Sequence, residues 1–317
     1  MLISQKLKQT FGKNLKFDEP LKKWTTFRIG GLAKYFLIAK NNEVLIKAIK
    51  IAKENKIKYF ILGAGSNLLF SDLGFNGLVI KVHNSQLVIC NSKIIVAAGV
   101  RLIYLVTSSV KFGLTGLEWA AGIPGSVGGA VYQNAGAFGS DLSESIQSVL
   151  VLRKGKIIKF KKRECQFAYR SSIFQKNQAV ILEVELKLKR GNNKKSQEEI
   201  KRIIDSRRTK QPTGHSAGSV FKNVNFKKIP AGVIKKYPQL QNFKRLGIIS
   251  AGWLIENSGI KGLKVGDAQI SEKHANFIIN KEKAKSKDVL KLISIAKKKV
   301  IKKFKTELQE EIEKISY

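Results

Sequence analysis

Cysteine and histidine are scarce in this chain of 317 residues. The two cysteines, Cys90 and Cys165, lie far apart in the sequence, and the three histidines are scattered without the close spacing of metal ligands. A disulfide-stabilised scaffold is therefore not expected. We predict no metal site either.

Long apolar runs are also missing. No run approaches the roughly 18 apolar residues that a membrane-spanning helix requires. Residues 1–16, MLISQKLKQTFGKNLK, carry charges where a signal peptide has its apolar core. The sequence therefore predicts a cytoplasmic protein without membrane insertion.

Acidic residues are few, 23 against 59 basic residues, which gives a net charge of +36. A basic face of this strength would attract a nucleic-acid backbone. The basic residues are 49 Lys and 10 Arg, however, and they are spread along the chain without the clustered Arg and interleaved aromatics that contact bases. A solvated, Lys-rich surface explains the charge equally well, so we expect no nucleic-acid partner.

Glycine, in contrast, is abundant in residues 116–141, which read GLEWAAGIPGSVGGAVYQNAGAFGSD. This stretch holds seven of the 26 glycines and only two charged residues, Glu118 and Asp141. Glycines let the backbone approach a ligand or another backbone closely. On the residues alone, the stretch either cradles a flat or anionic cofactor or forms a tight turn into a buried helix.

Part of this stretch, GIPGSVGGAVYQNAGAFG, resembles the signature of the UDP-N-acetylenolpyruvoylglucosamine reductase (MurB) family, flavoenzymes of peptidoglycan synthesis. Upstream, residues 24–31 are similar to the TxxxxGG opening of that family's flavin domain. Later blocks, described below, follow in the family's order, so the resemblance covers about residues 24–312.

A second glycine-rich loop, residues 63–67, follows an expected strand directly and reads GAGSN. Its backbone donors suit a pyrophosphate, and its spacing is not that of a GxGxxG Rossmann site. A plain hairpin loop is the alternative. LGAGSNLL resembles the diphosphate loop of FAD domains of the vanillyl-alcohol-oxidase (PCMH) type, and without a nearby His or Cys the flavin is expected to be non-covalent.

The resemblance implies that residues of both glycine-rich segments bind FAD. They are Gly63, Ala64, Gly65, Ser66, Asn67, Gly122, Ile123, Pro124, Gly125, Ser126, Gly129, Asn134 and Gly136.

An arginine among aromatic residues is the first candidate for chemistry. In FAYRSSIF, residues 167–174, Arg170 could be held rigid to pair with a carboxylate, or its stem could simply pack on aromatic surface. The segment resembles the family's YRxSxF motif, whose arginine contacts the enolpyruvyl carboxylate. By this resemblance Arg170 is catalytic.

A serine beside a glycine is the second candidate. GSVFKN, residues 218–223, resembles the family's GSxFKN motif, in which the serine gives a proton to the substrate carbon. The resemblance implies that Ser219 is the proton donor and that Lys210 and Asn223 bind the UDP phosphates. Val224 stands where the family has proline, which leaves the following turn open. A Ser-His-Asp nucleophile using His215 is the weaker interpretation.

The last candidate is a glutamate near the C-terminus. Four glutamates lie between residues 307 and 313, and solvent exposure is the ordinary expectation for each. Leu308 to Ile312, LQEEI, resembles the family's LxxEV ending. This makes Glu311 the second catalytic acid, with Glu310 as the alternative if the register shifts by one.

Periodicity predicts the remaining elements. After an N-terminal helix, helices are expected over residues 42–55 (capped by Asn42), 101–112, 196–206 (capped by Ser196), 250–259 and 286–304 (capped by Ser286). Strands are expected over residues 24–31, 35–39, 59–62, 77–82, 86–90, 93–98, 146–152, 156–160, 180–188 and 306–315, with two more in 266–280 and a linker at 191–197.

These expectations combine into an α+β protein: a two-subdomain FAD-binding domain of the PCMH type, residues 1–190, followed by a smaller α+β substrate-binding domain, residues 191–317. The implied activity is NADPH-dependent, FAD-mediated reduction of UDP-N-acetylglucosamine enolpyruvate to UDP-N-acetylmuramate, by a monomer. The short segment 190–205 indicates the subgroup without a tyrosine-bearing cap. Another FAD oxidoreductase, or a basic binding module without flavin, are the alternatives.

Overall fold

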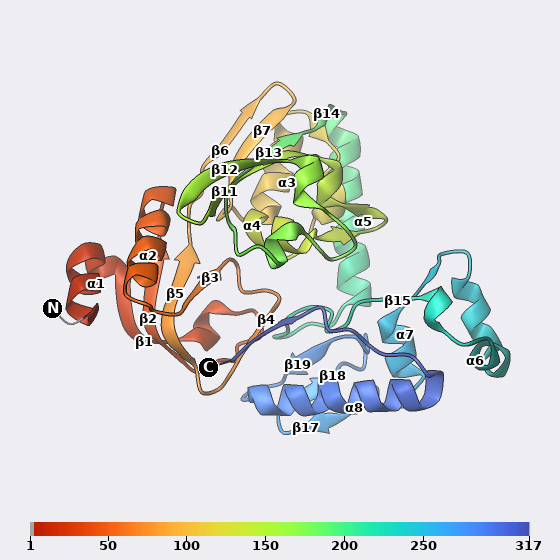
Figure 1. Ribbon diagram of the computed structural model, residues 1–317. Helices are drawn as coiled ribbons and strands as arrows, with labels where there is room; N and C mark the ends of the chain where they lie inside the picture. Colours follow the sequence, from red (N-terminus) through yellow and green to blue (C-terminus); the bar gives the residue numbers. More distant parts are fainter. Residues whose placement is uncertain (1–2, 317) are drawn as a thin grey trace. The chain divides into compact units, whose positions relative to one another are not determined.

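The computed structural model describes residues 3–316, which form two compact units (Figure 1). The first unit draws its described residues from Met1–Glu19, Ala33–Ala64 and Asn76–Thr209. The second unit draws them from Pro20–Leu32, Gly65–Phe75 and Lys210–Tyr317. The second unit therefore takes two segments from the N-terminal part of the chain in addition to the C-terminal part.

A four-stranded sheet forms one half of the first unit. Its strands, in spatial order, are β1 (Leu15–Pro20), β2 (Leu32–Ala39), β5 (Phe75–Val82) and β3 (Tyr59–Leu62). Helices α1 (Ile3–Phe11) and α2 (Asn42–Glu54) contribute to its core, in which Leu37, Leu45 and Ile80 are fully buried. Because β3 and β5 run parallel with Leu62 opposite Lys81, the end of β3 brings Gly63 next to Lys81.

A five-stranded antiparallel sheet forms the other half of this unit. Its order is β12 (Lys156–Lys161), β11 (Ile146–Arg153), β13 (Val180–Lys187), β7 (Lys93–Ala97) and β6 (Leu87–Cys90). Helix α4 (Val127–Gln133) packs on β13 and β7, and α3 (Leu102–Lys111) packs on α4. The predicted hairpin of β11 and β12 is confirmed, with Arg153 opposite Lys156. The alternation predicted for β13 holds only from Leu182 onward, since Val180, Ile181 and Leu182 are all buried.

Smaller elements complete the first unit. The two-residue strands β8 (Leu114–Thr115) and β14 (Lys189–Arg190) pair with each other, as do β9 (Gly136–Ala137) and β10 (Ser140–Asp141). The long helix α5 (Asn193–Lys210) follows, and its Ile203 belongs to the same core as the five-stranded sheet. This helix therefore packs as part of the first unit up to Thr209.

The second unit is built on a small antiparallel sheet of β17 (Lys264–Val265), β18 (Ala268–Ile270) and β19 (Ile278–Asn280). Helix α8 (Ser286–Phe304) lies along this sheet (Figure 1) and buries Val289, Ile293 and Val300. Its remaining elements are β15 (Val224–Asn225), β16 (Ile248–Ile249), α6 (Ala231–Lys236), α7 (Ala251–Glu256), β4 (Leu68–Phe70) and β20 (Glu313–Ile315). In the part of the chain that the structure describes, no helix is long and apolar enough to cross a bilayer.

Several local predictions were wrong. Residues 25–31 form no strand. The expected strand 306–315 is reduced to β20, which pairs in parallel with β4. The expected linker 191–197 is largely helical, since Asn192 caps α5 by accepting a hydrogen bond from the Lys195 amide at 3.1 Å. Asn41, not Asn42, caps α2.

Candidate functional site

The two glycine-rich segments meet in the first unit through Gly63 and Ser126. A Cβ added at Gly63 would lie 2.5 Å from the Ser126 hydroxyl oxygen, so any larger residue at position 63 would displace that side chain. Ser126 is 3% exposed and caps α4 by accepting a hydrogen bond from the Gly129 amide at 3.4 Å. The end of β3 and the start of α4 are thus in contact, with the Ser126 side chain against the backbone of Gly63, where glycine leaves room for it.

A buried glutamate fixes the start of residues 116–141. Glu118 is 8% exposed and accepts hydrogen bonds from the Thr115 hydroxyl and the Gly116 amide, both at 2.7 Å, and from the Ser196 hydroxyl at 2.5 Å. Burial alone would raise the pKa of Glu118, but these hydrogen bonds outweigh it and hold the pKa below its ordinary value. Glu118 thus connects the glycine-rich stretch to the first turn of α5. The sequence analysis did not predict this role.

An arginine further along α5 holds the same stretch. The Arg207 guanidinium donates from Nε to the Ala121 carbonyl at 2.8 Å, and burial lowers its pKa. Gly122 has φ +76°, and a Cβ there would lie 2.9 Å from the Arg207 side chain. A glycine at position 122 is therefore required both by its backbone conformation and by the arginine that covers it.

The far end of the stretch is connected to the Arg170 segment. Asn134 ends α4 in the left-handed conformation, with φ 44°, and donates from its side chain to the Ala168 carbonyl at 3.1 Å. Arg170 donates to the Gly136 carbonyl at 2.7 Å and lies over the Tyr169 ring. The carbonyl of Gly136, a predicted cofactor-binding residue, therefore fixes the position of Arg170. This position is compatible with both interpretations of Arg170, as a carboxylate-binding residue and as a side chain packed on an aromatic ring.

Lys81 was not predicted as a site residue, yet it lies at the same strand end. Its ammonium group donates to the Gly63 carbonyl. Burial and the nearby Arg101 guanidinium lower the pKa of Lys81 to about 8. A partly buried cation next to a second cation is costly unless an anion joins them.

In the second unit, the Ser219 segment is held on both sides. Ser219 bridges to Phe277, and the Val220 amide donates to the Asn276 carbonyl at 2.8 Å. On the other side, the Lys222 amide donates to the Gln309 carbonyl and the Glu311 amide to the Val220 carbonyl, both at 2.8 Å. The predicted proton donor and the predicted acid are thus carried by adjacent, hydrogen-bonded backbone segments.

The two alternatives for the acid differ in their surroundings. Glu310 pairs with Lys314 at 2.7 Å and with Lys297. Although burial would raise the pKa of Glu310, the two lysines lower it. Glu310 is therefore part of a structural ion-pair cluster, and the assignment of the acid to Glu311 stays a prediction.

The loop residues Gly65 and Asn67 lie in the second unit. Gly65 has φ +70°, and a Cβ there would lie 2.1 Å from the Trp24 carbonyl oxygen. The Asn67 side chain donates to the Glu311 carbonyl at 2.9 Å, and the Glu313 amide donates to the Asn67 carbonyl at 2.9 Å. A residue predicted to bind cofactor thus also fixes the backbone of the predicted acid.

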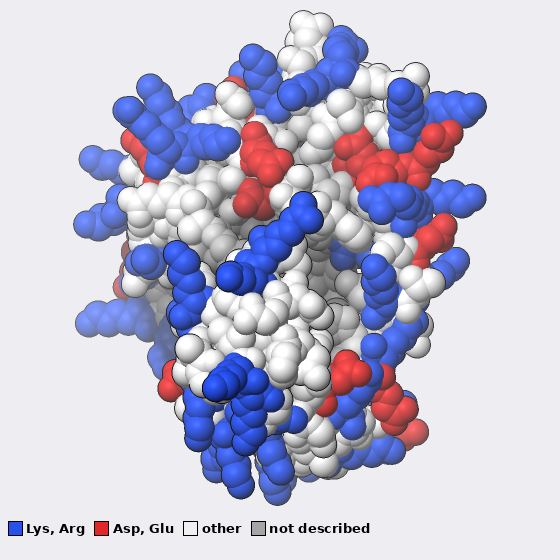
Figure 2. Space-filling view, turned by 90° about the vertical axis from the view of Figure 1, so that its right-hand side faces the viewer, with Lys and Arg blue, Asp and Glu red and all other residues white. Residues whose placement is uncertain are grey.

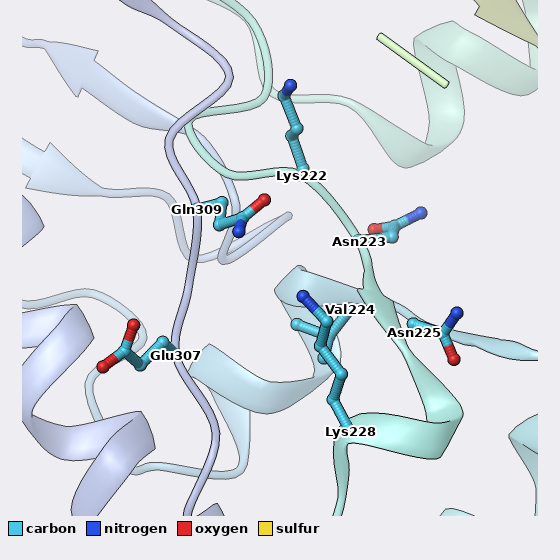
Figure 3. Close-up of a pocket in the computed structure, with 7 residues that line it drawn as sticks. All are labelled: Lys222, Asn223, Val224, Asn225, Lys228, Glu307 and Gln309. Carbon is cyan, nitrogen blue, oxygen red and sulfur yellow. The ribbon is translucent and has the colours of Figure 1, made fainter. Parts of the chain in front are cut away.

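A small polar pocket lies beside the GSVFKN segment (Figure 3). Its volume is about 30 Å³, room for a single small polar group. Asn223 lines the pocket and accepts a hydrogen bond from the Ala251 amide at 3.1 Å. The other lining residues are Lys222, Val224, Asn225, Lys228, Glu307 and Gln309. Lys210 is exposed and does not line this pocket, so the two predicted phosphate-binding residues have different environments in the second unit.

The strong positive charge is dispersed. Figure 2 shows Lys and Arg over much of the visible face, with acidic side chains among them. Among the ion pairs of the described residues are Lys159–Glu185 at 2.9 Å and the exposed pair Arg202–Glu199 at 2.6 Å. The charge is therefore that of a solvated surface in which the two signs are partly paired.

Comparison with known proteins identifies the family of the chain. A family model for an FAD binding domain matches residues 33–161, and a model for the C-terminal domain of UDP-N-acetylenolpyruvoylglucosamine reductase matches residues 210–315. Over 98% of its length, the chain is 41% identical to the UDP-N-acetylenolpyruvoylglucosamine reductase of Clostridium tetani, and it covers 95% of that protein. The chain belongs to the UDP-N-acetylenolpyruvoylglucosamine reductase family.

Further relatives agree with this family. Reductase 1 of Bacillus anthracis is 39% identical over 98% of both chains. The crystal structure of the Thermus caldophilus reductase has 33% identity and a TM-score of 0.75, covering 93% of this chain and 97% of its own. These findings confirm the recognised family and the predicted α+β fold with an FAD-binding domain. The protein is an FAD-dependent oxidoreductase.

Proposed function

We propose that the protein reduces UDP-N-acetylglucosamine enolpyruvate to UDP-N-acetylmuramate, with NADPH as the reductant, in the synthesis of peptidoglycan precursors. One observation carries the proposal: the hydrogen-bonded pairing of the Ser219 segment with the Glu311 segment in the second unit. This pairing gives a proton donor and an acid a fixed backbone setting in a chain that belongs to the reductase family.

FAD fits the glycine-rich segments because Gly63 and Ser126 bring the two segments together and because, among residues 3–316, Lys81 at the same strand end forms no ion pair with a carboxylate. When bound, FAD supplies the hydride that it has received from NADPH. In this scheme the residues that hold it are Gly63, Ala64, Gly65, Ser66, Asn67, Gly122, Ile123, Pro124, Gly125, Ser126, Gly129, Asn134 and Gly136.

Ser219 gives its hydroxyl proton to the substrate carbon next to the carboxylate. A serine hydroxyl is a weak acid, so the transfer requires a strongly basic carbon acceptor, and positioning matters more than acidity. Gly218, with φ +76° and no neighbour within 4 Å of an added Cβ, places little steric cover beside the serine. The backbone hydrogen bonds of Val220 then fix the position of the neighbouring Ser219.

Arg170 and Glu311 stabilise the negative charge that develops on the substrate carboxylate. The Arg170 guanidinium provides a fixed, charge-assisted donor, since one of its nitrogens is already tied to Gly136. Glu311, in its protonated form or through water, donates to the same developing charge. Lys210 and Asn223 bind the diphosphate of the sugar nucleotide, and the chain acts as a monomer in the cytoplasm.

Anaerobic stopped-flow absorbance tests both halves of the reaction. The wild-type flavin should bleach with NADPH and recover its colour when the enolpyruvyl sugar nucleotide is added. Ser219→Ala should bleach at the wild-type rate but recover about 10²- to 10⁴-fold more slowly, the usual loss for a missing general acid. Ser316→Ala, at an exposed serine of the same unit, is the matched control and should behave as wild type.

Three outcomes contradict parts of the proposal. Unchanged recovery in Ser219→Ala removes the role of that serine. A flavin that bleaches but is reoxidised only by other acceptors means a different FAD oxidoreductase. A purified chain that holds no flavin, even after incubation with FAD, overturns the cofactor assignment.

A further inference from the structure

Lys81 occupies a position that an ordinary surface lysine would not. It lies on β5 opposite Leu62, at the point where β3 ends and the loop starting with Gly63 begins. Its ammonium group is partly buried and donates to the Gly63 carbonyl. An ammonium group has three donors, so two of them remain for other acceptors.

The surroundings of Lys81 lack a compensating negative charge. Its charged neighbour is Arg101, which precedes α3 and bridges to Ser126, the residue that touches Gly63. Among residues 3–316, neither Lys81 nor Arg101 forms an ion pair with a carboxylate. A partly buried ammonium group near a second cation, the exposed Arg101, is unfavourable without an acid in the free protein and becomes favourable once an anion binds.

We propose that Lys81, assisted by Arg101, binds the diphosphate of FAD at the Gly63 end of the cofactor loop. The assignment rests on the proposed function, because it takes FAD as the cofactor of this site. The diphosphate is favoured over the flavin ring because it carries two negative charges, whereas the oxidised ring is neutral. It is also favoured by Gly63, which opens the loop whose backbone donors suit a pyrophosphate.

The chemistry of the contact explains why a lysine is needed here. A diphosphate oxygen accepts a charge-assisted hydrogen bond from the ammonium group, and the bond is strong because the site is partly withdrawn from water. The Gly63 carbonyl holds the ammonium group in position before the cofactor arrives, so little side-chain entropy is lost on binding. Lys81 is thus a cofactor-binding residue outside the glycine-rich motifs.

The test compares the full-length wild type with Lys81→Met after removal of the bound flavin. Affinities for FAD and for riboflavin, which has the same ring but no phosphate, are measured by flavin fluorescence. For Lys81→Met we expect the dissociation constant for FAD to rise roughly 10- to 100-fold, as for the loss of one hydrogen bond to a charged group. The constant for riboflavin and the reduction potential of bound FAD should stay at the wild-type values.

Two further variants serve as controls. Lys47→Met, at an exposed lysine of α2 in the same unit, removes the same charge away from the site and should bind FAD as wild type does. Lys81→Arg keeps the charge and should recover part of the affinity. The flavin-free Lys81→Met protein should melt at or above the wild-type temperature, because an uncompensated buried charge has been removed.

The outcomes separate this proposal from the proposed function. If wild type binds FAD and Lys81→Met binds it equally well, Lys81 has no part in the site and the proposal fails alone. A lowered melting temperature with unchanged affinity makes Lys81 structural. Equal losses for FAD and riboflavin, with a shifted potential, place Lys81 at the flavin ring and overturn the diphosphate assignment. If wild type binds no FAD, the proposed function fails first.

Discussion

Glu118 in the first unit and Glu310 in the second are both shielded carboxylates, yet they are stabilised in opposite ways. Glu118 is surrounded by neutral donors: two hydroxyls and a backbone amide. Glu310 is held by the ammonium groups of Lys297 and Lys314. Both pKa values are lowered although burial would raise them.

The difference shows what each region needs. Around Glu118, directional hydrogen bonds fix the backbone of the glycine-rich stretch and connect it to α5. Hydroxyl and backbone amide groups, which lie on or near the main chain, define this geometry more closely than long, flexible lysine side chains would. Around Glu310, the two lysines come from α8 and from β20, so charge holds two segments near the predicted acid. The first arrangement should be insensitive to salt, and the second should weaken with salt.

The largest expected effect comes from Glu118→Ala. The change leaves the Ser196 and Thr115 hydroxyls and the Gly116 amide without their acceptor, which should lower the free energy of unfolding by about 3 kcal/mol. Urea unfolding of the full chain measures it. Glu198→Ala, at an exposed glutamate of α5, is the control, and a loss for Glu118→Ala no larger than for this control would contradict the role of Glu118.

A smaller effect is expected from Glu310→Gln. The two lysines that it pairs with are partly exposed, with side-chain exposures of 41% and 48%, so the loss of unfolding free energy should be about 1 kcal/mol at low salt and less at high salt. Flavin reoxidation by the substrate should change by only a few-fold. If Glu310→Gln abolishes reoxidation and Glu311→Gln does not, the assignment of the acid must be exchanged.

The smallest effect is the pH dependence of the Glu118 contribution. A carboxylate whose pKa is lowered on folding stabilises the protein above its unfolded pKa, roughly 4.3, and loses this contribution as the pH falls through the folded value. The difference in unfolding free energy between wild type and Glu118→Gln should therefore shrink on acidification from neutral pH. A difference that grows on acidification would mean that Glu118 is protonated in the folded protein.

Elements with local signals could be predicted from the sequence. The alternation in β13 and the apolar periodicity of α8 depend on neighbouring residues only, and both elements appear at the predicted positions. The two glycine-rich segments could be recognised because their glycines lie close together in the chain. Their site roles stay predictions, although the close approach of Gly63 and Ser126 agrees with them.

Features that depend on distant partners could not be predicted. The start of α5 looked like a linker, yet Ser196 there bonds to Glu118, 78 residues away. Ser286, predicted as a helix cap, instead donates its hydroxyl to Asp72 at 2.7 Å. Lys81 resembles any lysine on a strand, because only the parallel register with β3 brings it to Gly63.

The parallel pairing of β20 with β4 affects the order in which the two units can fold during synthesis. Residues 313–315 pair with residues 68–70, which are synthesised long before them. Leu68–Phe70 therefore stays without this partner strand until residues 313–315 have been synthesised. The first unit has all of its residues by position 209 and can fold on the nascent chain, whereas the second also needs residues that are synthesised after position 209.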